Sequence, residues 1–317
     1  MAANWMRRTA LVTACATAVL LAACGSSTTE SALKPSRFIA FGDAVTDLGQ
    51  NGSSYTVNNG SVNIWTRYVA SQYGMEIKPS SQGGLNYAFG NARIAVTPDA
   101  AGNAATPTLA AQIDSFLAAN TLQGDDVVLL NAGLSDMVVG LRAVIDGTQT
   151  ADQYIASARA LGKQYADQIR RLTNAGAKHV VFSGVYSLGR TPWAIERGQA
   201  ANADQATRAF NDALLIGVTD LGNSTLYVEL EYYVNEYVDH PGNYGFSNAT
   251  TPVCTSVDPG PGIGIGAGEV NSALCTNSTL VAGADPEKFV FADKVYLAPS
   301  ANRQFGAHAY DKLRFRW

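Results

Sequence analysis

A short turn at residues 42–49, with the sequence GDAVTDLG, places two carboxyl side chains directly after the apolar run Phe38–Phe41. In α/β proteins, a turn at the carboxyl end of a buried strand is where ligand-binding and catalytic groups gather. Asp43 and Asp47 could act there as acids, bases or cation ligands. The position that follows Asp43 holds Ala44, whose methyl group cannot act as a nucleophile.

Three further segments carry residues suited to the same kind of site. Residues 83–92 (GGLNYAFGNA) are rich in glycine, which allows a ligand to approach the backbone closely. Residues 133–136 (GLSD) follow an apolar run that ends at Asn131. Residues 291–299 (FADKVYLAP) lie near the C-terminal end and combine an acid with a phenol.

The order and sequences of these four blocks resemble those of the GDSL (SGNH) family of serine ester hydrolases. The resemblance places Ala44 at the position of the nucleophilic serine. It places Gly90 at the backbone oxyanion donor and Ser135 at the asparagine that completes the oxyanion hole. The triad acid corresponds to Asp293, and the general base, a histidine in the family, corresponds to Tyr296.

Three of these positions lack the group that the family's chemistry uses. Removal of the nucleophile, as at Ala44, lowers kcat by a factor on the order of 10⁶. Tyrosine has a pKa of about 10 and is a poor general base near neutral pH, whereas histidine titrates at about 6.5. Loss of one oxyanion donor lowers kcat by a factor of about 10²–10³, and the hydroxyl of Ser135 could partly replace that donor. An engineered change would account for Ala44 alone, so natural degeneration is the simpler explanation.

The sequence therefore predicts a pseudoenzyme that keeps the hydrolase fold as a binding or structural module, with an acyl or glycan group as its ligand. The alternative is an active esterase or lipase that cleaves carboxylic esters through a non-standard residue set. Its nucleophile would come from a serine near a strand end, namely Ser135, Ser183 or Ser300. Its base would be one of the histidines, His179, His240 or His308. No such serine lies in a Gly-x-Ser-x-Gly elbow, and His308 is the least implausible base.

No cofactor or metal site is predicted. The aspartates of the four blocks could form a cation site, but hydrogen bonds to turn amides are the favoured interpretation; they are Asp43, Asp47, Asp136 and Asp293. The glycine-rich stretch 260–268 lacks the Gly-Lys-[Ser/Thr] ending of a phosphate-binding loop.

The elements that must position these blocks alternate along the chain. Short apolar runs predict buried strands at Phe38–Phe41, Val127–Asn131, Val180–Ser183, Leu226–Val228 and Phe289–Phe291. Apolar residues at helical spacing predict helices at 62–73, 108–119, 151–175, 199–217 and 300–313. This alternation predicts a single three-layer α/β/α domain with a central parallel sheet over residues 37–317, which the resemblance identifies as the flavodoxin-like SGNH-hydrolase fold.

The N-terminal segment predicts export. Residues 1–23 have the basic start and apolar run of a signal peptide, and the run is short for a membrane span. The ending LAAC resembles a bacterial lipobox, which implies acylation of Cys24 and a lipid anchor, with 24–36 as a flexible tether. A plain signal peptide or a transmembrane anchor is the alternative. Gly25 is not the aspartate associated with inner-membrane retention, which favours the outer membrane of the cell envelope.

The net charge argues against one class of partner, and the cysteines predict a disulfide. The formal net charge is −4, and it becomes −6 without residues 1–23, which carry Arg7 and Arg8 and no acid. Nucleic-acid binding is therefore disfavoured. Two of the four cysteines lie at or before residue 24, which leaves Cys254 and Cys275 as a predicted disulfide in an exported protein.

Overall fold

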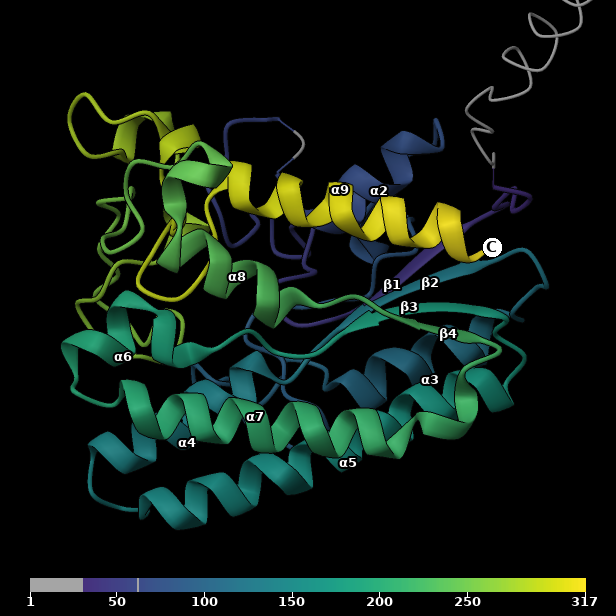
Figure 1. Ribbon diagram of the computed structural model, residues 1–317, viewed down its shortest axis with the longest axis horizontal. Coiled ribbons are helices and arrows are strands. Elements are labelled where there is room, and N and C mark those ends of the chain that lie inside the picture. The colour runs from purple at the N-terminus through teal and green to yellow at the C-terminus, as the bar shows by residue number, and fades with distance from the viewer. Residues whose placement is uncertain (1–30, 62) are drawn as a thin grey trace, which may run out of the picture.

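A four-stranded parallel sheet forms the centre of the protein, whose computed structural model describes residues 31–61 and 63–317 (Figure 1). Its strands lie in chain order and are β1 Phe38–Gly42, β2 Val127–Asn131, β3 His179–Ser183 and β4 Thr225–Tyr227. The first two strands are buried at every residue, and β3 is buried at all but its first. Helices on both faces of the sheet exclude water, which explains why these strands are unbroken apolar runs in the sequence.

Helices cover the sheet on both sides and give the three layers that the sequence predicts (Figure 1). One face carries α3 Leu109–Ala119, α4 Leu134–Ile145, α5 Ala151–Asn174 and α7 Ala200–Gly217. The other carries α2 Trp65–Gln72, α8 Leu230–Asp239 and α9 Pro299–Arg316. The short helix α6, Pro192–Glu196, follows β3 at the carboxyl end of the sheet.

Close packing holds the outer helices together. On one face, α5 lies against α7 at Gly162, where a Cβ atom would come 2.1 Å from the carbonyl oxygen of Phe210. On the other, the rings of Trp65 in α2 and Phe305 in α9 lie 5.5 Å apart. The amphipathic α5 begins with a capping box between Thr150 and its third residue, which is why its start is readable from the sequence.

Residues 85–89 extend the sheet beyond β1 without forming a regular strand. The N–H of Ala40 donates to the carbonyl oxygen of Leu85, and the carbonyl oxygen of Ala40 accepts from the N–H of Tyr87. The N–H of Phe89 then donates to the carbonyl oxygen of Gly42. This pairing carries the glycine-rich second block to the carboxyl end of β1.

One predicted strand is wrong. Residues Phe289–Phe291 form only isolated bridges, from Phe289 to Asn248 and from Phe291 to Leu297. Their apolar character reflects burial in the loop before α9, and a short apolar run cannot by itself distinguish a strand from a buried loop. The helices α4, α6 and α8 were not predicted, because the start of α4 was interpreted as a catalytic block and α8 is rich in β-favouring tyrosine and valine.

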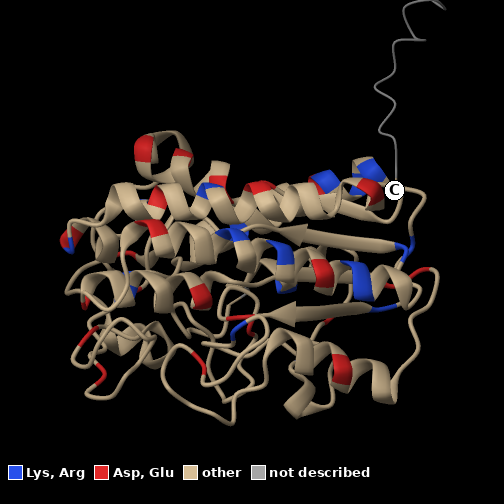
Figure 2. Ribbon diagram, turned by 90° about the horizontal axis from the view of Figure 1, so that it is seen from below, with Lys and Arg blue, Asp and Glu red and all other residues tan. Residues whose placement is uncertain are grey.

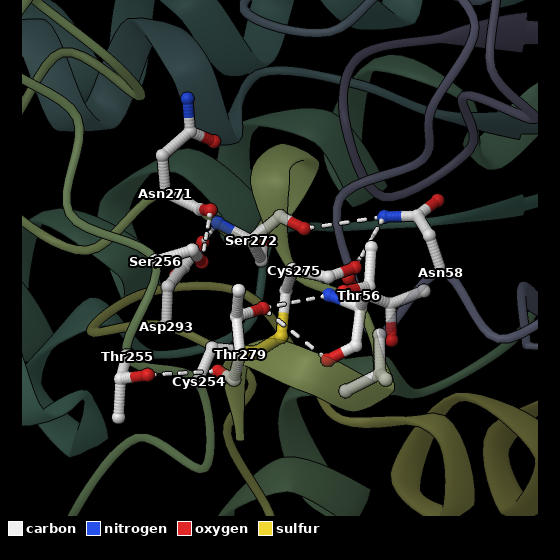
Figure 3. Close-up of a disulfide and its surroundings, with 12 residues drawn as sticks. Thr56, Asn58, Cys254, Thr255, Ser256, Asn271, Ser272, Cys275, Thr279 and Asp293 are labelled. Carbon is white, nitrogen blue, oxygen red and sulfur yellow. Dashed lines mark hydrogen bonds between the residues drawn. A yellow bond between two sulfur atoms is a disulfide. The ribbon is translucent and has the colours of Figure 1, made fainter. Parts of the chain in front are cut away.

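The predicted disulfide between Cys254 and Cys275 is present, with 5.8 Å between the Cα atoms (Figure 3). It closes a loop within the irregular segment between α8 and α9, whose regular structure is limited to short 3₁₀ turns such as Ser272–Leu274. The side chain of Asn58 donates to the carbonyl oxygens of Ser272 and Cys275, as Figure 3 shows. The bridge thus closes the segment on itself, and the hydrogen bonds of Asn58 hold it against the loop that follows β1.

The predicted signal peptide, Cys24 and the first part of the predicted tether lie outside the described residues. Within residues 31–61 and 63–317, no helix has both the length and the apolar character to cross a bilayer.

Candidate active site

Asp43 ties the turn after β1 to the start of α4. Its carboxylate is fully buried and accepts hydrogen bonds from the backbone N–H groups of Val45 at 3.2 Å, Leu134 at 2.9 Å and Ser135 at 3.3 Å. Burial raises the pKa of Asp43 to about 7, although these three hydrogen bonds act in the opposite direction. The carboxylate therefore joins the first and third blocks as a structural clamp.

Two glycines allow this close approach. Gly42 has φ +146°, and a Cβ atom there would lie 1.8 Å from the carbonyl oxygen of Asn131 in the neighbouring strand. Gly133 has φ +106° immediately before α4, a conformation that disfavours other residues. These positions let the ends of β1 and β2 turn together.

Gly90 reaches the site, but its N–H is already bonded. That N–H donates to Oδ2 of Asp47 at 2.7 Å, while Oδ1 of Asp47 accepts from the N–H groups of Gly49 and Gln50. Burial raises the pKa of Asp47 to about 6. The ring of Tyr55 covers the other side of Gly90, where a Cβ atom would meet the ring at 1.9 Å. The backbone donor that corresponds to the oxyanion hole is therefore occupied and covered.

Asp136, in the third block, holds the chain that leaves the second block. Its Oδ1 accepts from Nε of Arg93 and its Oδ2 from the N–H of Ile94, both at 2.8 Å. Burial raises the pKa of this carboxyl group, and the charge of Arg93 opposes the shift. Asp136 thus links the second and third blocks.

The carboxylate of Asp293 binds the backbone of the turn in the fourth block and does not orient the side chain of a general base. Its Oδ1 accepts from the N–H groups of Val295 at 2.7 Å and Tyr296 at 2.6 Å, and its Oδ2 accepts from the N–H of Ser272 at 3.1 Å. Burial raises the pKa of Asp293 to about 6. The carboxylate binds the backbone of Tyr296, and among the described residues the phenol oxygen of that tyrosine has no hydrogen-bond partner.

Aromatic rings fill the space around Tyr296. The ring of Tyr55 packs edge-on against it with 5.3 Å between centroids, and the hydroxyl of Tyr186 donates to the carbonyl oxygen of Val295 at 2.7 Å. Burial, together with the negative charge of nearby Asp43, raises the pKa of Tyr296 well above its usual value. The phenol therefore stays protonated and cannot serve as a general base near neutral pH.

The five positions that the sequence singles out lie around the carboxyl ends of β1 and β2 and in the adjoining C-terminal segment, and all are closed to solvent. Ala44 and Ser135 are 0% exposed, Tyr296 is 1% exposed, and Gly90 and Asp293 are also buried. The blocking tyrosine, Tyr55, was missed by the sequence reasoning. Its one signal was an isolated aromatic residue in the polar loop after β1.

The substitute groups of the alternative hypothesis have other partners. Oγ of Ser183 accepts from Nδ2 of Asn131 at 2.7 Å, and Ser300 lies in the first turn of α9. Nε2 of His308 lies 3.3 Å from Glu229, and the ring of His179 packs against another aromatic residue, Trp317. Within the described part of the chain, no group of three histidine, cysteine or acidic side chains is arranged to hold a metal ion.

Tyr296→Phe is expected to raise the free energy of unfolding by about 1 kcal/mol, because a buried hydroxyl without a partner carries an uncompensated desolvation cost. Tyr186→Phe is the matched control and should lower it by about 1 kcal/mol, since its hydroxyl is bonded to Val295. Denaturant melts of both variants measure the two effects. Equal losses would mean that the Tyr296 hydroxyl is bonded after all.

Comparison with known proteins gives a consistent set of similarities. Residues 38–309 match the family described as GDSL-like Lipase/Acylhydrolase. A GDSL esterase/lipase of Arabidopsis thaliana is 27% identical over 180 residues, covering 52% of this chain and 44% of that protein. Lipase 1 of Photorhabdus luminescens is 29% identical over 175 residues, covering 52% of this chain and 25% of that protein. The matched region thus spans less than half the length of either relative.

Among solved structures, a member of the lipolytic protein G-D-S-L family from Veillonella parvula is similar with a TM-score of 0.46 and 11% identity. The alignment covers 87% of this chain and 96% of that structure.

Proposed function

The chain belongs to the GDSL-like lipase/acylhydrolase family, and we propose that it is a member that has lost ester hydrolysis and keeps the hydrolase scaffold as a binding or structural module. One observation carries the proposal: the nucleophile and base positions hold Ala44 and Tyr296, both buried. The occupied N–H of Gly90 adds to it, because a bound ester would find no free backbone donor at this position.

An active esterase would need a different nucleophile next to a base. The hydroxyl of Ser135 is fully buried and has no hydrogen-bond partner among the described residues, so no neighbouring base accepts its proton. Ser183 is bonded to an asparagine amide, which cannot remove a proton at neutral pH. These contacts favour the inactive form over the alternative.

The test is hydrolysis of p-nitrophenyl acyl esters by the purified protein, with an active GDSL-family lipase as the positive control. We expect no turnover above that of the heat-denatured protein, and no labelling by a fluorophosphonate probe that reacts with activated serines. Turnover that is lost in Ser135→Ala would overturn the proposal and identify the substitute nucleophile.

The proposal includes export and a lipid anchor at Cys24, with outer-membrane placement favoured over the inner membrane. The lipobox-like sequence supports it, and so does the Cys254–Cys275 disulfide, which is typical of oxidising compartments. An acyl or glycan group is the proposed ligand class. Labelling with a fatty-acid precursor should mark the wild type but not Cys24→Ala. Equal labelling of the two proteins would show that Cys24 is not acylated.

A further inference from the structure

The first described residues leave the domain beside the last turn of α9. The hydroxyl of Ser31 and the N–H of Leu33 both donate to the carbonyl oxygen of Trp317, at 2.9 and 3.1 Å. Figure 1 shows the chain entering the domain at this end, next to the end marked C and far from α6. Whatever holds the N-terminal segment therefore also holds the end of α9 close by.

The chain between Cys24 and Ser31 is short. Seven residues span at most about 25 Å even when fully extended. If Cys24 is acylated, as the proposed function states, the end of α9 must lie within that distance of the lipid surface. This inference rests on that proposed anchor for its location, although the surface itself is a property of the folded domain.

Cationic and aromatic side chains gather at this end; we call them the α9-end patch, which consists of the exposed Lys34, Lys178, Phe315 and Arg316 and the half-buried Arg314 and Trp317. Phe315 is 69% exposed, and the guanidinium of Arg314 lies 4.8 Å from the centre of its ring. The guanidinium of Arg316 lies 5.5 Å from the ring centre of Trp317. These stacked pairs keep the cations and the apolar rings on one surface.

The patch is positive in a protein whose formal net charge is −4. The acidic residue in α9 is Asp311, which pairs with Arg314 at 3.3 Å, and Glu229 is balanced by Lys312 at 2.8 Å. A further acid, the exposed Asp125, lies near His179, so the four cations of the patch still outnumber the acids beside it. Arg316 donates to a carbonyl oxygen, that of Gly222, rather than to a carboxylate. Figure 2 shows Lys and Arg segments, together with an acidic segment, in the turns beside the end marked C.

We propose that the α9-end patch docks on the surface of an anionic phospholipid bilayer. Each arginine or lysine near such a surface is attracted by the lipid charge, and Phe and Trp side chains favour the headgroup level. A basic aromatic patch next to the acylated cysteine adds a second contact with the bilayer and fixes the orientation of the domain on it. Docking would orient the domain with α6 directed away from the bilayer.

The test uses quenching of Trp317 by brominated phosphatidylglycerol vesicles in the chain that begins at residue 24 and carries Cys24→Ser, so that the apolar leader and Trp5 are absent. Trp65 and Trp193 are buried, so Trp317 is the tryptophan that lipid can reach. We expect quenching by anionic vesicles and not by brominated phosphatidylcholine. Arg314→Gln, Phe315→Ser and Arg316→Gln together should raise the vesicle concentration for half-maximal quenching about thirtyfold or more.

The matched control removes two arginines and one exposed apolar side chain at the opposite end, through Arg190→Gln, Ile195→Ser and Arg197→Gln. Ile195 is 51% exposed, and this control should leave the quenching unchanged. Equal quenching of the parent and the α9-end variant would overturn the proposal. Because Cys24→Ser removes the acylation site from every sample, failure of the lipid anchor in the labelling experiment leaves this result independent.

Discussion

Restoring the family's residues through Ala44→Ser, Ser135→Asn and Tyr296→His is expected to give no measurable esterase activity while Tyr55 is present. The ring of Tyr55 lies against Gly90 and packs on the side chain at position 296, so it fills the space that an acyl group would need beside the oxyanion and base positions. Adding Tyr55→Ala should raise kcat/KM for a p-nitrophenyl acyl ester by a factor of about 10³ over the wild type.

The expected gain in activity is smaller than the loss caused by removing a nucleophile, because one oxyanion donor, the N–H of Gly90, stays occupied. A restored nucleophile raises kcat by a factor on the order of 10⁶, whereas a missing oxyanion donor lowers kcat by a factor of about 10²–10³. The N–H of Gly90 remains bonded to Asp47 in this variant, so the oxyanion would have to rely on the other donors. Tyr55→Ala alone is the control and should be inactive. Full activity of the triple variant would show that Tyr55 does not block the crevice.

The convergence of the first and third blocks could be predicted from the sequence because each of them follows a short apolar strand. The runs that became β1 and β2 are apolar throughout, and parallel strands bring their carboxyl ends to one edge. The turns at Gly42 and Gly133 then place Asp43 against α4. Local sequence and sheet geometry were sufficient for this part of the site.

The closure of the crevice could not be predicted in the same way. Tyr55 lies in a polar loop without helical or strand periodicity, and its contacts with Gly90 and Tyr296 join residues that are far apart in the sequence. The position of that loop depends partly on Asn58, whose partners lie in the disulfide-bonded segment. Such contacts between irregular segments leave no periodic pattern in the sequence, and the same reason accounts for the wrong strand at Phe289–Phe291.

Asp43→Ala is expected to lower the free energy of unfolding by about 3 kcal/mol or more, because its carboxylate joins the turn after β1 to the start of α4. The substitution leaves three buried N–H groups without an acceptor, and each such group costs about 1–3 kcal/mol. Asp167→Ala, at an exposed position in α5, is the control and should change stability by less than about 0.5 kcal/mol. A loss below about 1 kcal/mol for Asp43→Ala would contradict the clamp.

The pH dependence of this loss of stability shows whether the fold prefers Asp43 as a neutral carboxyl group or as a carboxylate. The pKa of Asp43 is about 7 in the folded protein and about 3.9 when the chain is unfolded, so the folded state binds the proton more tightly. The stability that Asp43 contributes is therefore present at low pH and declines as the pH rises from about 4 to about 7. The other buried aspartates are common to both proteins, so the difference between wild type and Asp43→Ala should be larger at pH 5 than at pH 8. The opposite order would mean that the ionised carboxylate is the form that the fold prefers.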